Sequence, residues 1–346
     1  MYKTVKDKKV PRWQTDLFWE EKGKIILAIV LLIFFGTICY LHYELHNRAD
    51  WYTAKPEDRP FSDVMLTPKG NVELKEILCR RHQDHCYYIT DLHLPHDKIL
   101  RRLQQEPQQH TILGAGYVTS TGRLEQDILW AQYTRLALQG PFMFNVTGKN
   151  ALQIGLGSGT SGAFLEHLGY KITSIELEPM IIHIAQKWFG VPGNSDHTVI
   201  EGDGFDYVVN RSTDEEKFDF AFIDTSYFDD LHLFISPVDI FTTSDFVKEL
   251  RKHMNKECAV VLNTYSRHNE LDKMLEAERH RHAMLMKYRK YFQTCFFIET
   301  SDNSLIFCSC KQTQKMTQIK YDYFLSHLPP HMYSKLVVDG NVREEW

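Results

Sequence analysis

Residues 152–179 read LQIGLGSGTSGAFLEHLGYKITSIELEP, a stretch in which two predicted strands flank a predicted helix. A short apolar run ends at Gly155, Gly157 and Gly159, and a helical pattern follows, so the glycines stand where a strand turns into a helix. Glycine lets the backbone approach a ligand closely, and the first turn of a helix leaves backbone N–H groups free. A plain tight turn would also explain the glycines, so other residues are needed to distinguish the two interpretations.

Acidic residues end the next three predicted strands. Glu176 lies 21 residues after Gly155, where a carboxylate can bind both hydroxyls of a ribose. Asp203 ends the third strand, where it could hold an adenine amino group, and Asp224 ends the fourth. Because open α/β sheets bind ligands at the carboxyl ends of their strands, these residues predict a site for an adenosyl cofactor.

From residue 150 onward, strands alternate with helices, which indicates a parallel sheet covered on both faces. The expected strands are 151–155, 172–176, 198–201, 218–224 and 258–263. The expected helices are 158–168, 179–189, 204–210, 243–254 and 269–288. Strands at 293–300 and 304–310 are expected to close the sheet as an antiparallel hairpin, and a helix over 125–138 is expected before it.

The run quoted above, followed by IEGDGFDYV and FDFAFIDTSYFD, resembles the spermidine-synthase-like methyltransferase family between residues 116 and 310. The resemblance implies a Rossmann-like, seven-strand class I methyltransferase sheet with an N-terminal β-rich addition. It also implies S-adenosyl-L-methionine as the cofactor. Glu176 would bind the ribose, and Asp203 and Gly204 the adenine end. The amino-acid or sulfonium end would lie on the loop formed by Gly155, Gly157, Ser158 and Gly159.

Departures from the polyamine-synthase pattern favour methyl transfer over aminopropyl transfer. Ser158 stands where aminopropyltransferases carry an aspartate, and no second aspartate lies three residues after Asp224. A polyamine has several ammonium groups that need carboxylate partners. Asp224 could still act as a general base, and Tyr133 occupies the position of an active-site tyrosine, although a half-buried helical aromatic is an equally good interpretation. Residues 263–265 could line the acceptor pocket, but the acceptor itself stays unknown.

Residues 25–43 contain no Asp, Glu, Lys or Arg and are long enough to span a bilayer. Seven Lys or Arg residues precede this segment and only three occur in the twenty residues after it. The positive-inside bias therefore predicts a type II membrane protein whose larger part is lumenal, in the endoplasmic reticulum or Golgi, or extracellular. Sequons at 145–147 and 210–212 agree with this orientation, as do six cysteines beyond the span.

The predicted parts are a cytosolic tail (1–24), a transmembrane signal-anchor (25–43), a stem (44–71), an N-terminal β-rich and helical region (72–147), the methyltransferase-like domain (148–312) and a C-terminal extension (313–346).

Other partners and functions are constrained less tightly. A net charge of −5 gives no reason to expect nucleic acid as a partner, and a homodimer is compatible with the sequence. The cysteines and histidines of residues 79–86 match no standard spacing for a zinc site. A Cys79–Cys86 disulfide is the simpler interpretation, and no metal is therefore expected. A catalytically inactive lumenal domain that keeps the fold remains an alternative.

Overall fold

The computed structural model describes residues 51–55, 71–80, 85–105, 112–227, 232–266, 270–301, 303–338 and 340–343. The chain divides into two compact units, which are described separately. In the smaller unit, strand β1 (Trp51–Thr53) pairs antiparallel with Leu78, Cys79 and Arg80, the last residues of β2 (Asn71–Arg80). The larger unit contains residues 54–77 and 85–346, and with them both the remaining sheet structure and the candidate site.

The larger unit is built on an eight-stranded sheet in the order β13-β11-β12-β10-β9-β6-β7-β8. Its strands are β6 (Asn150–Ile154), β7 (Lys171–Glu176), β8 (His197–Glu201), β9 (Phe218–Ile223), β10 (Met254–Thr264), β11 (Thr294–Glu299), β12 (Ser304–Ser309) and β13 (Asn341–Arg343). Strands β6 to β10 are parallel, and β11, β12 and β13 pair antiparallel. The order in which strands are added to the sheet reverses at β6 and β9, which lie side by side and parallel, and such a switch point is where open α/β sheets bind ligands.

Side chains on the central strands alternate between two apolar cores. On β10, Val260 and Leu262 pack into one core, whereas Ala259 and Val261 pack into the other. A strand buried on both faces reads as a continuous apolar run, which is why these strands could be located from the sequence. Asn263 follows at the end of the same strand and is a buried polar residue.

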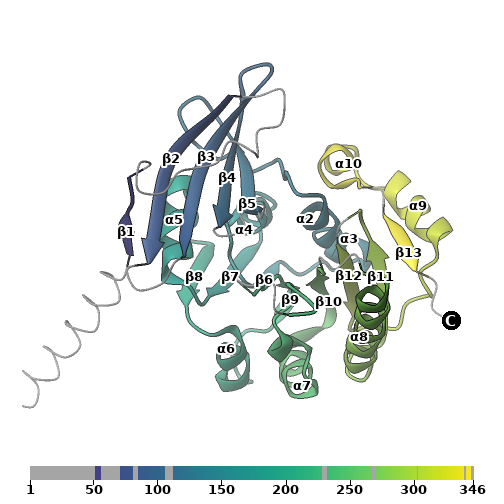
Figure 1. Ribbon diagram of the computed structural model, residues 1–346. Coiled ribbons are helices and arrows are strands. Elements are labelled where there is room, and N and C mark those ends of the chain that lie inside the picture. Colours follow the sequence, from purple (N-terminus) through teal and green to yellow (C-terminus); the bar gives the residue numbers. More distant parts are fainter. Residues whose placement is uncertain are drawn as a thin grey trace, which may run out of the picture. The chain divides into compact units, whose positions relative to one another are not determined.

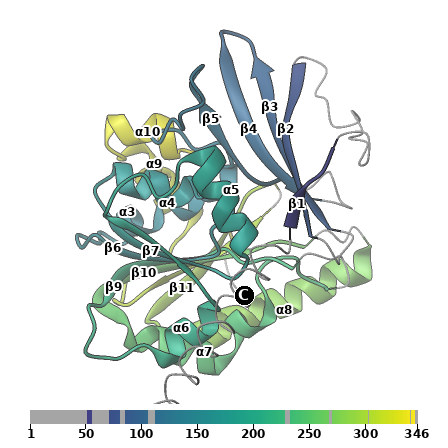
Figure 2. The same cartoon turned by 90° about the vertical axis from the view of Figure 1, so that its left-hand side faces the viewer.

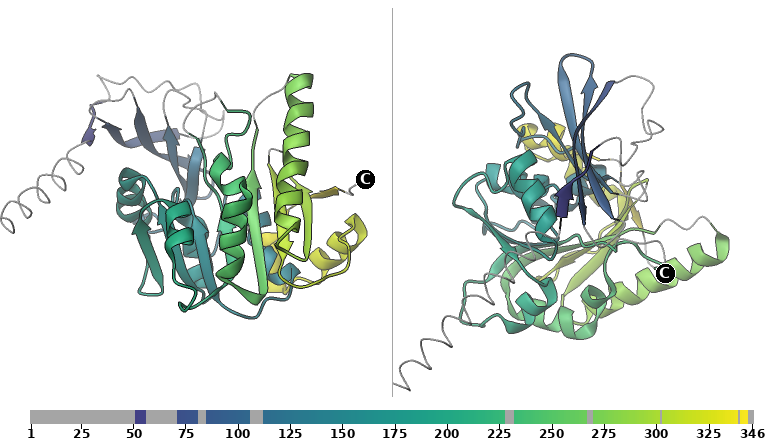
Figure 3. Two further views of the ribbon diagram at one scale, coloured as in Figure 1. Left: turned by 90° about the horizontal axis from the view of Figure 1, so that it is seen from below. Right: turned by 60° about the vertical axis from the view of Figure 1, so that its left-hand side comes forward.

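Helices cover both faces of this sheet. Figure 2 shows α3, α4 and α5 on one side of the strands and α6, α7 and α8 on the other. Figure 1 labels the same elements, and the left panel of Figure 3 shows the second group side by side in front of the strands. The helices are α2 (Gln132–Ala137), α3 (Gly140–Met143), α4 (Thr160–His167), α5 (Pro179–Phe189), α6 (Gly204–Asn210), α7 (Ser244–Lys252), α8 (Leu271–Arg289), α9 (Gln318–Ser326) and α10 (Pro330–Leu336), with a 3-10 turn η2 at Asp239–Thr242.

A second, antiparallel sheet precedes the large one. Within the larger unit it contains the first part of β2 together with β3 (Cys86–Leu94), β4 (Lys98–Gln105) and β5 (Ile112–Val118). Arg101 of β4 fixes this sheet to the end of α5: its guanidinium forms a buried bidentate pair with Asp91 and donates a further bond to the Trp188 carbonyl oxygen at 2.8 Å.

Three expectations about the elements need correction. The large sheet has eight strands and not seven, because β13 adds to the outer edge of β11, pairing Val342 with Ile298. The helix expected over 125–138 is confined to α2, since residues 125–130 lack helical structure. The strand expected over 258–263 begins earlier, at Met254.

The membrane segment predicted at 25–43 lies outside the described residues, as do the tail and most of the stem. In the part of the chain that the structure describes, no helix is both long and apolar enough to cross a bilayer.

Candidate functional site

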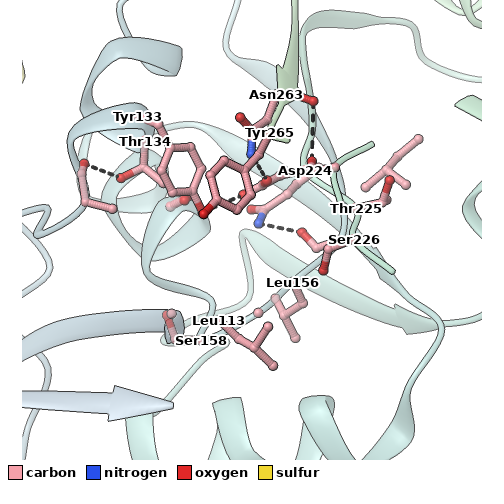
Figure 4. Close-up of a pocket in the computed structure, with 18 of the residues that line it drawn as sticks. Leu113, Tyr133, Thr134, Leu156, Ser158, Asp224, Thr225, Ser226, Asn263 and Tyr265 are labelled. Carbon is pink, nitrogen blue, oxygen red and sulfur yellow. Dashed lines mark hydrogen bonds between the residues drawn. The ribbon is translucent and has the colours of Figure 1, made fainter. Parts of the chain in front are cut away.

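A cavity of about 720 Å³ opens at the carboxyl ends of the parallel strands. The loops after β6, β7, β8 and β9 line it, together with β5, α2 and the end of β10. Figure 4 shows Tyr133, Asp224, Asn263 and Tyr265 gathered in one part of the cavity, with Leu113, Leu156 and Ser158 in another. Every cofactor and catalytic candidate from the sequence lines this cavity except Gly159, which lies in the same glycine loop.

The glycines are required by close backbone contacts. Gly155 has φ +89°, and a Cβ placed on it would lie 2.1 Å from the carbonyl oxygen of Asp224. Gly159 has φ +75° and is the N-cap of α4, where a Cβ would lie 2.8 Å from Val191. Any other L-residue would be strained in these left-handed conformations and would also collide with its neighbours. The glycine pattern therefore brings the β6 loop against the end of β9.

Glu176 holds the glycine loop through backbone hydrogen bonds. Its Oε2 accepts from the Leu156 N–H at 2.8 Å and its Oε1 from the Glu178 N–H at 2.9 Å. Burial raises the pKa of this carboxyl, and the N–H donors of Leu156 and Glu178 oppose that rise because they stabilise the ionised form. Each carboxylate oxygen keeps an acceptor site, so both could still bind ribose hydroxyls.

Asp203 and Gly204 begin helix α6. Asp203 is exposed, and its Oδ1 caps the helix by accepting from the Phe205 N–H at 2.7 Å. Gly204 is buried, and a Cβ there would lie 2.4 Å from the side chain of Ile154. The pair therefore has a structural role in placing α6 beside β6, in addition to lining the cavity.

Asp224 is the centre of a half-buried hydrogen-bond network. Tyr133 donates its hydroxyl to Oδ2 at 3.0 Å, and the Asn263 side-chain amide donates to Oδ1 at 2.8 Å. Burial raises the pKa of Asp224, and the two donors partly offset that rise. Burial and the charge of Asp224 together raise the pKa of Tyr133 well above its ordinary value. Tyr133 is thus a half-buried aromatic of α2 whose hydroxyl contacts Asp224 in the wall of the cavity.

Asn303 belongs to the same network and was missed by the sequence analysis. Its side-chain amide donates to Oδ1 of Asn263 at 2.9 Å, which leaves the Asn263 amide nitrogen to face Asp224. The turn between β11 and β12 fixes Asn303, because its backbone N–H donates to the Thr300 hydroxyl at 3.1 Å. An asparagine in a hairpin turn is an ordinary turn residue, so only the register of the hairpin could have identified it.

The residues present fit an adenosyl group. The volume lies within the usual range of about 300–1,000 Å³ for ligand pockets. The glycine loop supplies close backbone approach, and Glu176 supplies a half-buried carboxylate at the end of β7. Gln153, which stands where typical class I methyltransferases carry an acid, donates its side-chain amide to the Gly155 carbonyl oxygen at 2.8 Å and so supports the loop.

The six cysteines among the described residues are all disulfide-bonded. Cys79 and Cys86 are both disulfide-bonded, so neither offers a thiolate for zinc, and residues 81–84 lie outside the described part. Cys295 is bonded to Cys308 across the β11–β12 hairpin, and Cys258 to Cys310. Within the described ranges there is no group of three or more His, Cys, Asp and Glu residues that could hold a metal ion.

Comparisons with known proteins identify the fold. A probable spermidine synthase from Corynebacterium glutamicum superposes with a TM-score of 0.58 at 13% identity, covering 81% of this chain and 92% of that structure. The chain therefore has the spermidine-synthase-like form of the class I methyltransferase fold. No family model matches the chain.

Two kinds of enzyme occur among the curated relatives. A polyamine aminopropyltransferase of Chromobacterium violaceum is 32% identical over 139 residues, which is 39% of this chain and 49% of the relative. The homolog of an eEF1A lysine and N-terminal methyltransferase in Drosophila melanogaster is 24% identical over 175 residues, or 49% of this chain and 24% of the relative. The chain thus spans about half the length of the first relative and about a quarter of the second.

Proposed function

We propose that the chain is an S-adenosyl-L-methionine-dependent methyltransferase, anchored in the membrane by residues 25–43, with its catalytic domain on the lumenal or extracellular side. The observation that carries the proposal is the Tyr133–Asp224–Asn263 network beside Gly155, in a cavity whose other wall is the glycine loop and Glu176.

The cofactor would supply an activated methyl group on its sulfonium. Glu176 would bind the ribose hydroxyls, and the backbone from Gly155 to Gly159 would approach the amino-acid end. The first turn of α6, which Asp203 and Gly204 begin, would lie at the adenine end. Because such a methyl group needs little chemical assistance, what the protein must supply is the in-line placement of the acceptor and the exclusion of water.

Asp224 is suited to take a proton from the acceptor nucleophile. Its raised pKa brings a carboxylate closer to the range in which general bases work best. The Tyr133 hydroxyl and the Asn263 amide hold the two carboxylate oxygens in place. An acceptor with an ionisable N–H or O–H group is therefore the class that this site would serve.

Aminopropyl transfer is the second candidate. The named activity of the Chromobacterium relative and the Tyr133–Asp224 contact favour it. Against it, Asp224 is the only carboxylate that lines the cavity besides Glu176 and Asp203, counted over the residues that the structure describes. A polyamine with several charges would therefore lack partners for most of its ammonium groups.

The compartment assignment is supported by cysteine chemistry. The six cysteines that follow the predicted anchor are all disulfide-bonded. Disulfides persist in oxidising compartments and are rare in the cytosol. Asn145 and Asn210, the two sequon asparagines, are both exposed, so glycosylation is sterically open to each.

Ligand-induced stabilisation of the full chain, purified in detergent, tests the proposed function. S-adenosyl-L-methionine or its demethylated product at 100 times the dissociation constant should stabilise the protein by about 2.7 kcal/mol, seen as a higher melting temperature. The absence of a shift at millimolar ligand would contradict the enzyme proposal and favour the inactive-domain alternative. A shift with decarboxylated S-adenosylmethionine alone would favour aminopropyl transfer.

A further inference from the structure

Arg135 lies in the wall of the cavity and forms no ion pair with any residue in the part of the chain that the structure describes. Across the described ranges it is the one positively charged side chain that lines the cavity, whose other charged residues are Glu176, Asp203 and Asp224. The arginine is half-buried, and its Nε is buried without a hydrogen-bond partner. The proposed transfer reaction gives this side chain no role.

The position of Arg135 follows from the two faces of α2. Thr134, Leu136 and Ala137 are buried by the packing of this helix on the large sheet. Gln132 and Arg135, three residues apart, share the remaining face, and both line the cavity. The sequence Gln132–Ala137 therefore folds so that one helix contributes both the Asp224 partner Tyr133 and a guanidinium to the same cavity.

The acids of the cavity do not neutralise this guanidinium. Glu176 accepts from two backbone N–H groups, Asp203 caps α6, and Asp224 accepts from Tyr133 and Asn263. A half-buried cation that lacks a counter-charge loses part of its hydration without an ion pair to offset that loss. A bound anion would compensate that loss, and the planar fork of arginine matches a carboxylate best.

The location of α2 indicates which part of the ligand would carry the carboxylate. Tyr133 contacts Asp224, and the Asp224 backbone lies against Gly155, so α2 stands at the glycine-loop end of the cavity. Glu176 and Asp203 mark the ribose and adenine positions. The amino-acid end of an adenosyl cofactor would therefore lie on the side of Arg135.

We propose that Arg135 binds the ligand carboxylate, supplied by the amino-acid end of the cofactor, and so makes the site select S-adenosylmethionine over its decarboxylated form. The inference rests on the proposed function, because it assumes that the cavity binds an adenosyl group. The inference adds to that function a residue that selects the cofactor. S-adenosylmethionine and its decarboxylated form differ only in this carboxylate, and the relatives include both methyltransferases and aminopropyltransferases.

The test is calorimetric titration of the full chain in detergent with two probes, S-adenosylhomocysteine and S-adenosyl-3-thiopropylamine, which is the same molecule without the carboxylate. Wild-type protein should bind S-adenosylhomocysteine about 10- to 100-fold more tightly than the decarboxylated probe, the value expected for a charge-assisted bidentate pair. Arg135→Met should remove that preference by lowering the affinity for S-adenosylhomocysteine while leaving the affinity for the decarboxylated probe unchanged. Arg135→Lys should retain part of it. Arg279→Met, which removes an exposed charge from α8 outside the cavity, should leave both affinities unchanged.

The outcomes separate this inference from the proposed function. If the wild-type chain binds neither probe, the proposed function fails. If it binds both probes equally, or if Arg135→Met weakens both equally, the function stands and the cofactor assignment of Arg135 is wrong. A second arm then titrates sodium glutarate into the chain saturated with S-adenosylhomocysteine. Loss of glutarate binding in Arg135→Met would place the carboxylate on the acceptor, and unchanged binding would overturn the carboxylate proposal.

Discussion

At the scale of single residues, the three carboxylates of the cavity are distinguished by what surrounds them. Exposed Asp203 caps a helix, whereas half-buried Glu176 is held by backbone N–H groups and half-buried Asp224 by side-chain donors. Backbone donors are fixed by the fold, but side-chain donors can be exchanged by mutation. The protonation of Asp224 is therefore the most readily altered property of the site.

Replacing Asn303 should change the pH profile of the reaction. In Asn303→Asp the new carboxylate can only accept, so the Asn263 amide should turn its nitrogen towards residue 303 and its carbonyl oxygen towards Asp224. Asp224 would lose a donor and face a second negative charge, and its pKa should rise further. The acid limb of kcat/KM should move to higher pH by about one unit or more.

The pH profile is measured with any acceptor that becomes known for the chain. Asn194→Asp, the same change in an exposed loop, is the matched control and should leave the profile in place. An unshifted acid limb in Asn303→Asp would show that Asp224 does not control it.

His197 should make stability depend on pH. Its ring is fully buried, bonds the Ser174 hydroxyl at 2.8 Å and faces Glu166 at 3.8 Å, and burial lowers its pKa from 6.5 to about 4. His197 binds a proton more readily in the unfolded chain than in the folded one. Its contribution to the free energy of unfolding is therefore complete above pH 6.5 and is lost as the pH falls towards 4. The loss should approach about 3 kcal/mol.

Urea unfolding of the full chain between pH 4 and 7 measures this loss. His197→Gln should flatten the dependence, whereas His282→Gln, which alters an exposed residue of α8, should keep it. An equally steep dependence in His197→Gln would assign the effect to other groups.

At the scale of elements, the β6 loop and the end of β9 meet backbone to backbone. In Gly155→Ala the methyl group would collide with the Asp224 carbonyl oxygen and also force alanine into a left-handed conformation. We expect the substitution to destabilise the fold by more than about 3 kcal/mol and to abolish cofactor binding.

Gly190 offers the matched comparison, since it also has positive φ (+65°) but nothing lies within 4 Å of its Cβ position. Gly190→Ala should cost only about 1 kcal/mol. Chemical denaturation of the two variants separates the effect of the collision from that of the conformational strain. Equal losses in the free energy of unfolding would disprove the close contact at Gly155.

The C-terminal hairpin matters at the same scale. Strands β11 and β12 extend the sheet beyond β10, and their turn brings Asn303 to Asn263. The hairpin thus also helps to orient the Asp224 carboxylate, through Asn303 and Asn263.

At the scale of the whole molecule, oxidation of the cysteines should contribute to stability. The Cys258–Cys310 and Cys295–Cys308 bonds close loops with separations of 52 and 13 residues. A bond that restricts the unfolded chain in this way contributes about 3 to 4 kcal/mol for loops of these lengths. Reduction should therefore lower the melting temperature of the full chain.

Alkylation followed by mass spectrometry shows the redox state in the cell. Protein recovered from cells and alkylated without reduction should carry no label on the six cysteines beyond the predicted anchor. Quantitative labelling of these cysteines would contradict the lumenal assignment. Glycosidase treatment should change the electrophoretic mobility of the wild-type protein. The variant, Asn145→Gln or Asn210→Gln, in which that change is lost identifies the sequon that is glycosylated.

The sequence by itself determined the alternation of strands and helices, the glycine loop and the positions of Glu176, Asp203 and Asp224, because each depends on local signals of apolar periodicity, turn residues and strand ends. The resemblance pointed to the position of Tyr133, but its contact with Asp224 came from the structure. Asn303, the unpartnered charge of Arg135 and the buried His197 were decided by tertiary structure alone. The hydrogen bonds and burial of these three residues depend on neighbours that are distant in sequence. The register of the strands and the packing of the core fix which polar groups meet and which remain without a partner.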